Sequence, residues 1–196
     1  MGNKRSGQVR TTAGSGLNRT YIIVGAVIFL FIAGFVALVV LDARQQAGSS
    51  PPGEVETIDV GAANRHTESD VDYEQTPPAG GEHNPVWQNE GFYEAPVRDE
   101  NAVHTMEHGA VWITFSPDLP QDQKDRIQDL VESQNCMLAS PHPDLPTPVV
   151  ASAWGKQLTL ESADSPDLER FIRAYRLGPQ TPEVGAACTG GTSDTA

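Results

Sequence analysis

Four of the five histidines of this chain lie in one stretch, at positions 66, 83, 104 and 108, and offer nitrogen ligands for a metal. His104 and His108 are four residues apart, so on a helix both imidazoles would project from one face. This spacing is typical of a pair of zinc ligands. With His83 and His66 completing the shell, the sequence predicts a site for a transition metal, copper or zinc.

The conformation of the segment 104–108 bears on which metal it favours. In an extended segment, His104, Met106 and His108 would share a face, because side chains alternate along a strand. The thioether of Met106 is a soft ligand that suits copper. A structural role is the alternative to metal binding: the histidines and Glu107 would then only brace loops through hydrogen bonds.

The same segment has the letters His-x-x-Glu-His of the inverted zincin proteases, in which the glutamate activates a zinc-bound water. Those enzymes place the motif in a long helix, whereas Gly109 and an apolar run follow here at once. A metal-dependent hydrolase that uses Glu107 is therefore the weakest of the three hypotheses. The chain also lacks a Gly-rich phosphate-binding motif and a Gly-x-Ser-x-Gly motif, which disfavours nucleotide-driven and serine-hydrolase chemistry.

The chain has two cysteines, Cys136 and Cys188. Outside the cytoplasm they could oxidise to a disulfide, which would tie the C-terminal tail to the central part of the domain. Closing a loop of this length stabilises a fold by roughly 4 kcal/mol. Two free thiols, or one thiol acting as a metal ligand, are the alternatives.

Periodicity in the second half of the chain predicts the elements that carry these side chains. Four short apolar runs are typical of strands, at 110–115, 136–139, 149–153 and 157–160. One helix is expected over 120–134, and another begins at Pro166 behind the N-cap Ser165 and ends near Gly178. Turn residues over 64–101 predict a loop-rich part. This order indicates an α+β fold, with two helices packed on a small sheet.

An uncharged apolar run over 21–41 predicts a transmembrane helix, because at about 1.5 Å per residue it spans the roughly 30 Å hydrocarbon core of a bilayer. A cleaved signal peptide is the alternative, although its apolar part is ordinarily only about 7–15 residues long. Four basic residues and no acidic ones precede the run, so the N-terminus is expected in the cytoplasm. We thus predict a single-pass protein of the plasma membrane with its C-terminal part outside the cytoplasm.

The whole chain has a formal net charge of −13, and because the first twenty residues are basic, the residues after this run are strongly acidic. An acidic domain repels phosphate backbones, so no nucleic-acid partner is expected. It attracts cations or basic partners instead. An interaction or structural protein of the cell envelope, which meets its partner through the acidic surface or through Trp87, Phe92 and Tyr93, is the alternative to a metal-binding module.

These patterns divide the chain into five parts. We expect a disordered basic cytoplasmic tail over 1–20, the transmembrane helix over 21–41, a flexible linker over 42–62, a globular domain over 63–190 and a disordered tail over 191–196. The Gly- and Pro-rich residues 48–53 are expected to be the most flexible part of the linker.

Three blocks of the sequence resemble a bacterial family. They are Asp72-Tyr73 with 77–87 (PPAGGEHNPVW), 96–109 (PVRDENAVHTMEHG) and Ala153-Trp154-Gly155. Together they are similar to the family called domain of unknown function 3105, with the block His-x-x-Glu-His-Gly as the most specific part. The resemblance implies a membrane-anchored or exported protein and assigns no activity. Members of the family often carry a cysteine where this chain has Glu90; if the relatives use it in a disulfide, the bridge has moved or been lost here.

Overall fold

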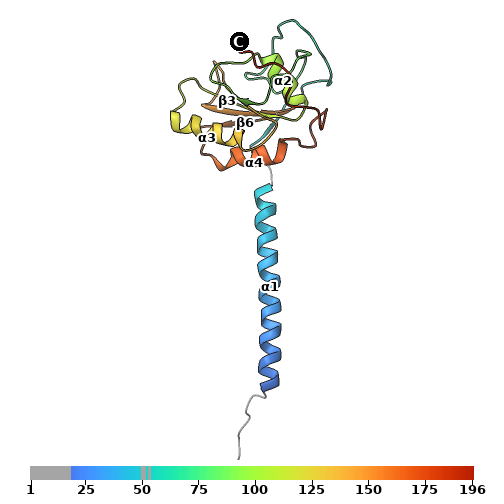
Figure 1. Ribbon diagram of the computed structural model, residues 1–196, viewed down its shortest axis with the longest axis vertical. Helices are drawn as coiled ribbons and strands as arrows, with labels where there is room; N and C mark the ends of the chain where they lie inside the picture. The colour runs from blue at the N-terminus through green and yellow to red at the C-terminus, as the bar shows by residue number, and fades with distance from the viewer. Residues whose placement is uncertain (1–18, 50–51, 53) are drawn as a thin grey trace, which may run out of the picture. The chain divides into compact units, whose positions relative to one another are not determined.

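The computed structural model of the protein describes residues 19–49, 52 and 54–196. The chain divides into two compact units, Met1–Ala47 and Gly48–Ala196 (Figure 1). The first unit contains most of helix α1 (Arg19–Ser49), and the second contains every other element. The disordered tail that the sequence predicts over 1–20 lies outside the described residues, apart from Arg19 and Thr20.

Helix α1 contains a segment, Tyr21–Val39, that is long and apolar enough to cross a membrane. It is the single candidate span among the described residues, and all its side chains are exposed. A bilayer would shield these apolar side chains, while the helix satisfies its own backbone hydrogen bonds.

The region 42–62, for which the sequence predicts a flexible linker, contains regular structure at both ends. Helix α1 continues to Ser49, because the residues after Leu41 include good helix formers and no proline occurs before Pro51. Strand β1 (Glu56–Thr57) then pairs with the sheet of the second unit, where Lys156 donates from its Nζ atom to the hydroxyl of Thr57.

The second unit is built on a six-stranded mixed sheet with the strand order β1-β6-β5-β3-β4-β2. After β1, its strands are β2 (Gly91–Phe92), β3 (Val111–Phe115), β4 (Met137–Pro141), β5 (Val149–Ala153) and β6 (Lys156–Leu160). Strand β3 pairs in parallel with β4 and antiparallel with β5. The four strands that periodicity predicts are therefore confirmed, and so is the α+β class.

Helices cover both faces of the sheet (Figure 1). Helices α3 (Gln121–Glu132) and α4 (Pro166–Tyr175) pack on one face, against Ile113 and its neighbours, as the sequence predicts. Helix α2 (Asp99–Glu107) packs on the other face, where Met106 contacts Trp112 and Leu138. This second face, whose helix the sequence left undecided, carries the loop-rich part of the domain.

The loop-rich part contains few strand residues but is tied firmly to α2. The backbone amide of Asn64 donates to a carboxylate oxygen of Glu107, and that of Val71 donates to Glu100. An isolated parallel bridge joins His66 to His83. The fold thus brings two histidine-bearing loops to the outer side of α2.

The C-terminal residues 191–196, for which the sequence predicts a disordered tail, form hydrogen bonds with these loops. Thr192 forms a bridge with Gln88, and the amide of Ala196 donates to the carbonyl of Pro96. The side chain of Asn89 also accepts from the amide of Gly191. These contacts join segments about a hundred positions apart, so local composition does not reveal them.

Candidate metal centre

Helix α2 positions two of the functional side chains. Asp99 and Glu100 in its first turn favour the positive end of the helix dipole, and the helix ends before Gly109, which has a positive φ of 108°. His104 and Glu107 are three residues apart and lie on neighbouring positions of one face. The structure therefore selects the helical alternative for this segment over the extended one.

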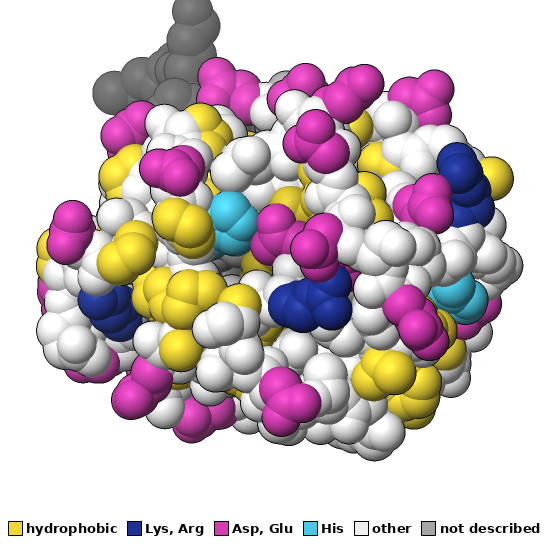
Figure 2. All heavy atoms as spheres, turned by 90° about the horizontal axis from the view of Figure 1, so that it is seen from above, with side chains coloured by type: hydrophobic (Ala, Val, Ile, Leu, Met, Phe, Trp, Pro, Cys, Tyr) yellow, Lys and Arg dark blue, Asp and Glu magenta, His cyan; other side chains and the backbone are white. Residues whose placement is uncertain are grey.

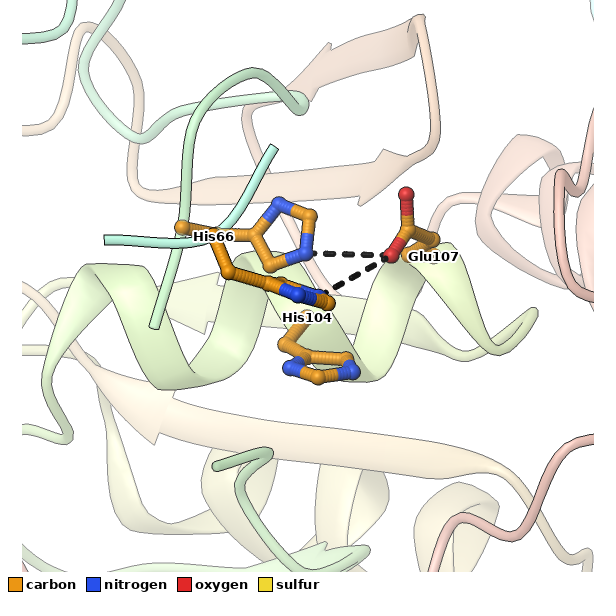
Figure 3. Close-up of side chains that lie close together, drawn as sticks. His66, His104 and Glu107 are labelled. Atoms are coloured by element: carbon orange, nitrogen blue, oxygen red, sulfur yellow. Dashed lines mark ion pairs between the residues drawn. The ribbon is translucent and has the colours of Figure 1, made fainter. Parts of the chain in front are cut away.

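Four side chains converge at this face of α2: His66, His83, His104 and Glu107. One potential ligand atom from each lies within 4.8 Å of the others. Figure 3 shows His66 reaching from its loop towards Glu107 on α2, with His104 beside them. His83, His104 and Glu107 are buried, whereas the side chain of His66 is 40% exposed. The group is therefore sealed on most sides and open on one.

Backbone carbonyls fix the orientation of the two buried imidazoles. His83 Nδ1 lies 2.7 Å from the carbonyl oxygen of Gly81, and His104 Nδ1 lies 2.6 Å from that of Asn84. A carbonyl only accepts, so each Nδ1 carries the proton and donates it. The Nε2 atom of each neutral ring then has a free lone pair, as in metal-binding histidines held by an outer hydrogen bond.

Glu107 faces these nitrogens with one of its two oxygens. Its Oε1 atom accepts from the amide of Asn64 at 2.6 Å, while Oε2 lies 3.0 Å from His83 Nε2 and 3.9 Å from His66 Nε2. Among the described residues, neither His83 Nε2 nor Glu107 Oε2 has a hydrogen-bond partner, although both are buried. Buried polar atoms without partners are rare and costly, so these two mark the point where a cation would be stabilised.

Burial keeps His104 neutral. It lowers the pKa of His104 to about 4, although the hydrogen bond from the ring to the Asn84 carbonyl raises this pKa. The neighbouring histidines lower the pKa further. At neutral pH the ring is therefore uncharged, which is the form that binds metals. The neutral His104 ring can therefore lie beside the other two imidazoles without charge repulsion.

The donor set of three imidazoles and one carboxylate matches the ligands that zinc takes in four-coordinate sites, and it also suits copper(II). Met106, the soft ligand of the extended alternative, is fully buried in the core beneath α2 and is not part of the set. The helix turns this side chain towards the sheet, so the set His104–Met106–His108 does not form.

The structure brings together three of the four predicted metal ligands, and it places His108 in a neighbouring group. That second group consists of His104, His108 and Glu183. Glu107 takes the fourth position of the first group; sequence analysis treated this residue only as a brace or a general base. Its place three residues after His104 on a helix was the signal for a shared ligand face. No local pattern pointed to Glu183.

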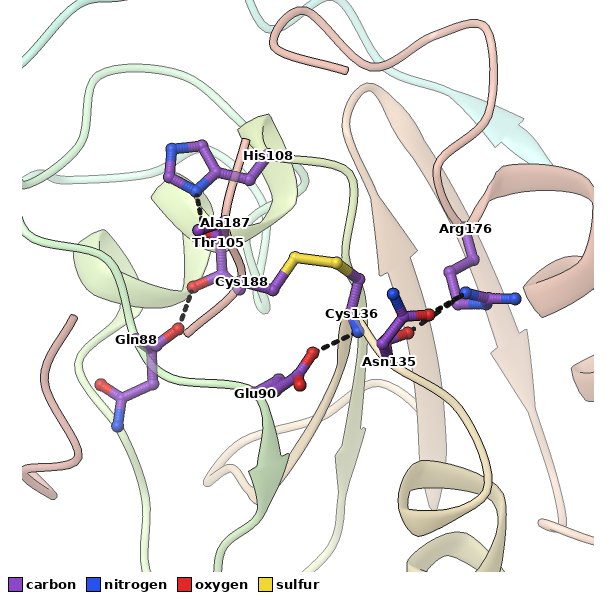
Figure 4. Close-up of a disulfide and its surroundings, with 9 residues drawn as sticks. All are labelled: Gln88, Glu90, Thr105, His108, Asn135, Cys136, Arg176, Ala187 and Cys188. Atoms are coloured by element: carbon purple, nitrogen blue, oxygen red, sulfur yellow. Dashed lines mark hydrogen bonds between the residues drawn. A yellow bond between two sulfur atoms is a disulfide. The ribbon is translucent and has the colours of Figure 1, made fainter. Parts of the chain in front are cut away.

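Cys136 and Cys188 are joined in a disulfide (Figure 4). Cys188 follows Ala187, whose carbonyl accepts a hydrogen bond from His108 Nδ1. The carboxylate of Glu90 accepts from the amide of Cys136, so position 90, where the resemblance implies a cysteine in relatives, lies beside the bridge. The disulfide therefore joins the segment behind His108 to the start of β4.

Comparison with known proteins agrees with the resemblance noted in the sequence. The family described as "Protein of unknown function (DUF3105)" matches residues 65–190. This range contains all the histidines, Glu107 and both cysteines. Searches of curated proteins and of solved structures found no match.

Proposed function

The chain belongs to the DUF3105 family, and we propose that its globular domain is a binding module for a transition-metal ion, zinc or copper. His66, His83, His104 and Glu107 would hold the ion. The observation that carries this proposal is a pair of buried atoms, His83 Nε2 and Glu107 Oε2, which have no hydrogen-bond partner among the described residues and face each other at 3.0 Å inside the group. A bound cation would satisfy both.

The ligand count favours holding an ion over catalysis. Four protein ligands complete a tetrahedral shell, whereas catalytic zinc sites keep one position open for water. Glu107 is fully buried and already accepts from the Asn64 amide, so it is placed as a ligand and not as a base facing a substrate. The partly exposed His66 shows that the group lies near the surface of the domain. A role in buffering, sensing or delivering the metal follows from these features.

We also propose that α1 is a retained anchor and that the domain lies outside the cytoplasm. The basic residues before the apolar segment support this orientation. The disulfide supports it as well, because such bonds persist in oxidising compartments. The intact mass of the protein isolated from membranes should include residues 1–41. Protease should digest the domain when it is added to cells whose outer layer is permeable but whose plasma membrane is intact. A mature chain that begins after the apolar segment would contradict the anchor.

Metal analysis of the full chain tests the proposal directly. The protein is purified in detergent without chelator or affinity histidines, and its metal content is measured before and after dialysis against Zn²⁺ or Cu²⁺. About one ion per chain is expected, as for a mononuclear site, and the variant His83→Ala/His104→Ala should lose it. His142→Ala is the matched control, because His142 is buried but lies outside both ligand groups. A folded wild-type protein that takes up neither ion would overturn the proposal.

Bracing by the histidines is the second candidate role, and specific contacts favour it. The carbonyls of Gly81, Asn84 and Ala187 each accept from a histidine Nδ1 atom. The bonds to Asn84 and Ala187 hold a loop and the C-terminal segment on α2 and its end, whereas the bond to Gly81 braces the loop of His83 itself. In an interaction protein of the envelope, the histidines would serve only to form these structural contacts. Thermal unfolding separates the two roles: a ligand raises the melting temperature of the state that binds it, whereas a brace gives the same temperature with and without metal.

A further inference from the structure

A second ligand group adjoins the proposed centre and shares one residue with it. His104, His108 and Glu183 each offer an atom within 4.8 Å of the other two. The imidazole centroids of His104 and His108 are 4.6 Å apart, which is as close as the spacing of the rings within the centre itself. The two groups therefore form one continuous cluster of imidazoles.

His108 is oriented in the same manner as the ligands of the centre. Its Nδ1 atom donates to the carbonyl of Ala187 at 2.7 Å, so Nε2 is the free nitrogen of the neutral ring. That Nε2 atom lies 3.5 Å from a carboxylate oxygen of Glu183. His108 is buried, whereas the Glu183 side chain is 36% exposed. The group thus leads from solvent to the buried His104.

Because the two groups share His104, they cannot both bind an ion through this residue at the same time. His104 Nδ1 is occupied by the Asn84 carbonyl, so its single Nε2 atom can bind one ion at a time. The second group without His104 retains only one imidazole and one half-exposed carboxylate, which makes it the weaker of the two. An ion held there by His104 and His108 would be one ligand exchange away from the centre.

Resting on the proposed function, we infer that His108 and Glu183, together with His104, form an uptake position through which a divalent transition-metal ion reaches the central site. The charge of the domain supports capture at this position, because acidic surfaces raise the local concentration of cations. Figure 2 shows acidic side chains spread over one face of the domain, with few basic ones among them. Trp87 packs on both His104 and His108, with ring centroids 5.7 and 5.0 Å away, and shields the step between them.

Rapid mixing of the metal-free full chain with Cu²⁺ tests this inference. Trp87 lies against His104 and His108, and Trp154 lies against His83, so quenching of tryptophan fluorescence follows the arrival of the ion. Glu183→Gln should slow association about tenfold, at the lower end of the range over which variants of one binding site differ. Dissociation into excess chelator should slow by the same factor, because a residue on the path alters both rates and leaves Kd unchanged.

Two further variants make the result specific. His108→Ala should reproduce the slowing, and Glu161→Gln should not, because it removes an equal charge from an exposed position outside both groups. Equal rates for Glu183→Gln, Glu161→Gln and wild type, with normal metal content, would overturn the uptake position and leave the proposed function standing. A larger Kd with an unchanged association rate would show that Glu183 only stabilises the ion in the centre. That result would also overturn the uptake position. A folded wild-type chain that binds neither Cu²⁺ nor Zn²⁺ would refute both proposals.

Discussion

Two buried glutamates of α2 have different surroundings, so their substitutions should have different effects. Glu100 accepts from the amide of Val71 and lies 3.3 Å from Arg98, so its charge is balanced by a cation of the protein. Glu107 has a backbone donor on one oxygen, while its other oxygen faces only imidazoles. The comparison of these two residues separates folding from metal binding.

We expect Glu107→Gln to fold and to bind zinc at least about tenfold more weakly, since outer partners of a metal site alone change affinity by 10–100-fold. The amide preserves the shape and can still accept from Asn64, but it is a poorer ligand than a carboxylate. Glu100→Gln is the matched control: it should lower the free energy of unfolding and leave zinc affinity unchanged. Competition with a chromogenic chelator measures the affinity. Equal zinc affinity in all three proteins would remove Glu107 from the site.

His142, the histidine outside the cluster of imidazoles, should make stability depend on pH. Burial lowers the pKa of His142, but the hydrogen bond and the charge of Asp99 outweigh it and raise this pKa above its ordinary value. A raised pKa in the folded state means that the contribution is complete below about pH 6.5 and is lost as the pH rises through the folded value. The difference in unfolding free energy between wild type and Asp99→Asn should therefore shrink towards high pH. Urea titrations across this range measure it, and a constant difference would contradict the pairing.

At the scale of the element, the end of α2 is the most constrained feature. Gly109 has a positive φ, and a Cβ atom there would lie 2.9 Å from a methyl group of Leu177 and 3.1 Å from that of Thr181. This glycine therefore allows both the turn that ends the helix and the close approach of the segment after α4. The position of His108 and Glu107 depends on that turn.

Gly109→Ala is expected to lower the free energy of unfolding by more than the roughly 1–3 kcal/mol of a strained backbone alone. Gly185→Ala is a suitable control, because Gly185 also has a positive φ but has no atom within 4 Å of an added Cβ. The excess loss in the first variant over the second measures the steric contact. Equal losses from urea unfolding would show that only the backbone conformation matters.

The sequence predicts elements well where one face is consistently apolar. Helix α4 begins as expected, with Ser165 accepting from the amide of Asp167, yet it ends at Tyr175 and not at Gly178. Leu177 adopts the left-handed conformation instead, at a φ of 52°. The sequence left α2 undecided between a helix and an extended segment, because α2 buries polar residues as well as apolar ones, and their partners lie in loops far along the chain. Periodicity carries no signal for such a helix.

The sequence indicated the types of residue in the candidate site, but it identified only some of the residues that form it. Histidine content and spacing pointed to His66, His83 and His104, because these are chemical properties of the sequence itself. The place of Glu107 required the helical conformation of α2, and that of Glu183 required the C-terminal segment to fold back towards His108. Long-range contacts of this kind are decided by tertiary packing, which a single sequence does not display.

At the scale of the whole molecule, the disulfide joins the residue before β4 to the segment after α4. Strands β4, β5 and β6 and helix α4 lie between the two cysteines. The disulfide closes a loop with a sequence separation of 52 residues. In chain-entropy terms, a loop of this length restricts the unfolded state by about 4 kcal/mol. The bridge therefore supports both the sheet and the segment that carries Ala187.

Cys136→Ser/Cys188→Ser should lower the free energy of unfolding by about 4 kcal/mol relative to the oxidised wild type. Urea unfolding with and without a reducing agent measures this: reductant should destabilise the wild type to the level of the double variant and leave the variant unchanged. Alkylation followed by intact-mass measurement should find no free thiol in the oxidised protein. A wild type that is insensitive to reductant and readily alkylated would show that the bridge does not form.

The same covalent link has a consequence for the lifetime of the protein. Asp144 and Pro143 lie in an exposed connection between β4 and β5, a kind of segment that proteases cut first. Because this connection lies between the two bridged cysteines, a single cut there would leave every part of the domain attached to the rest of the chain. The bridge thus acts as a safeguard against loss of the C-terminal half, and a nicked chain would separate into two fragments only after reduction.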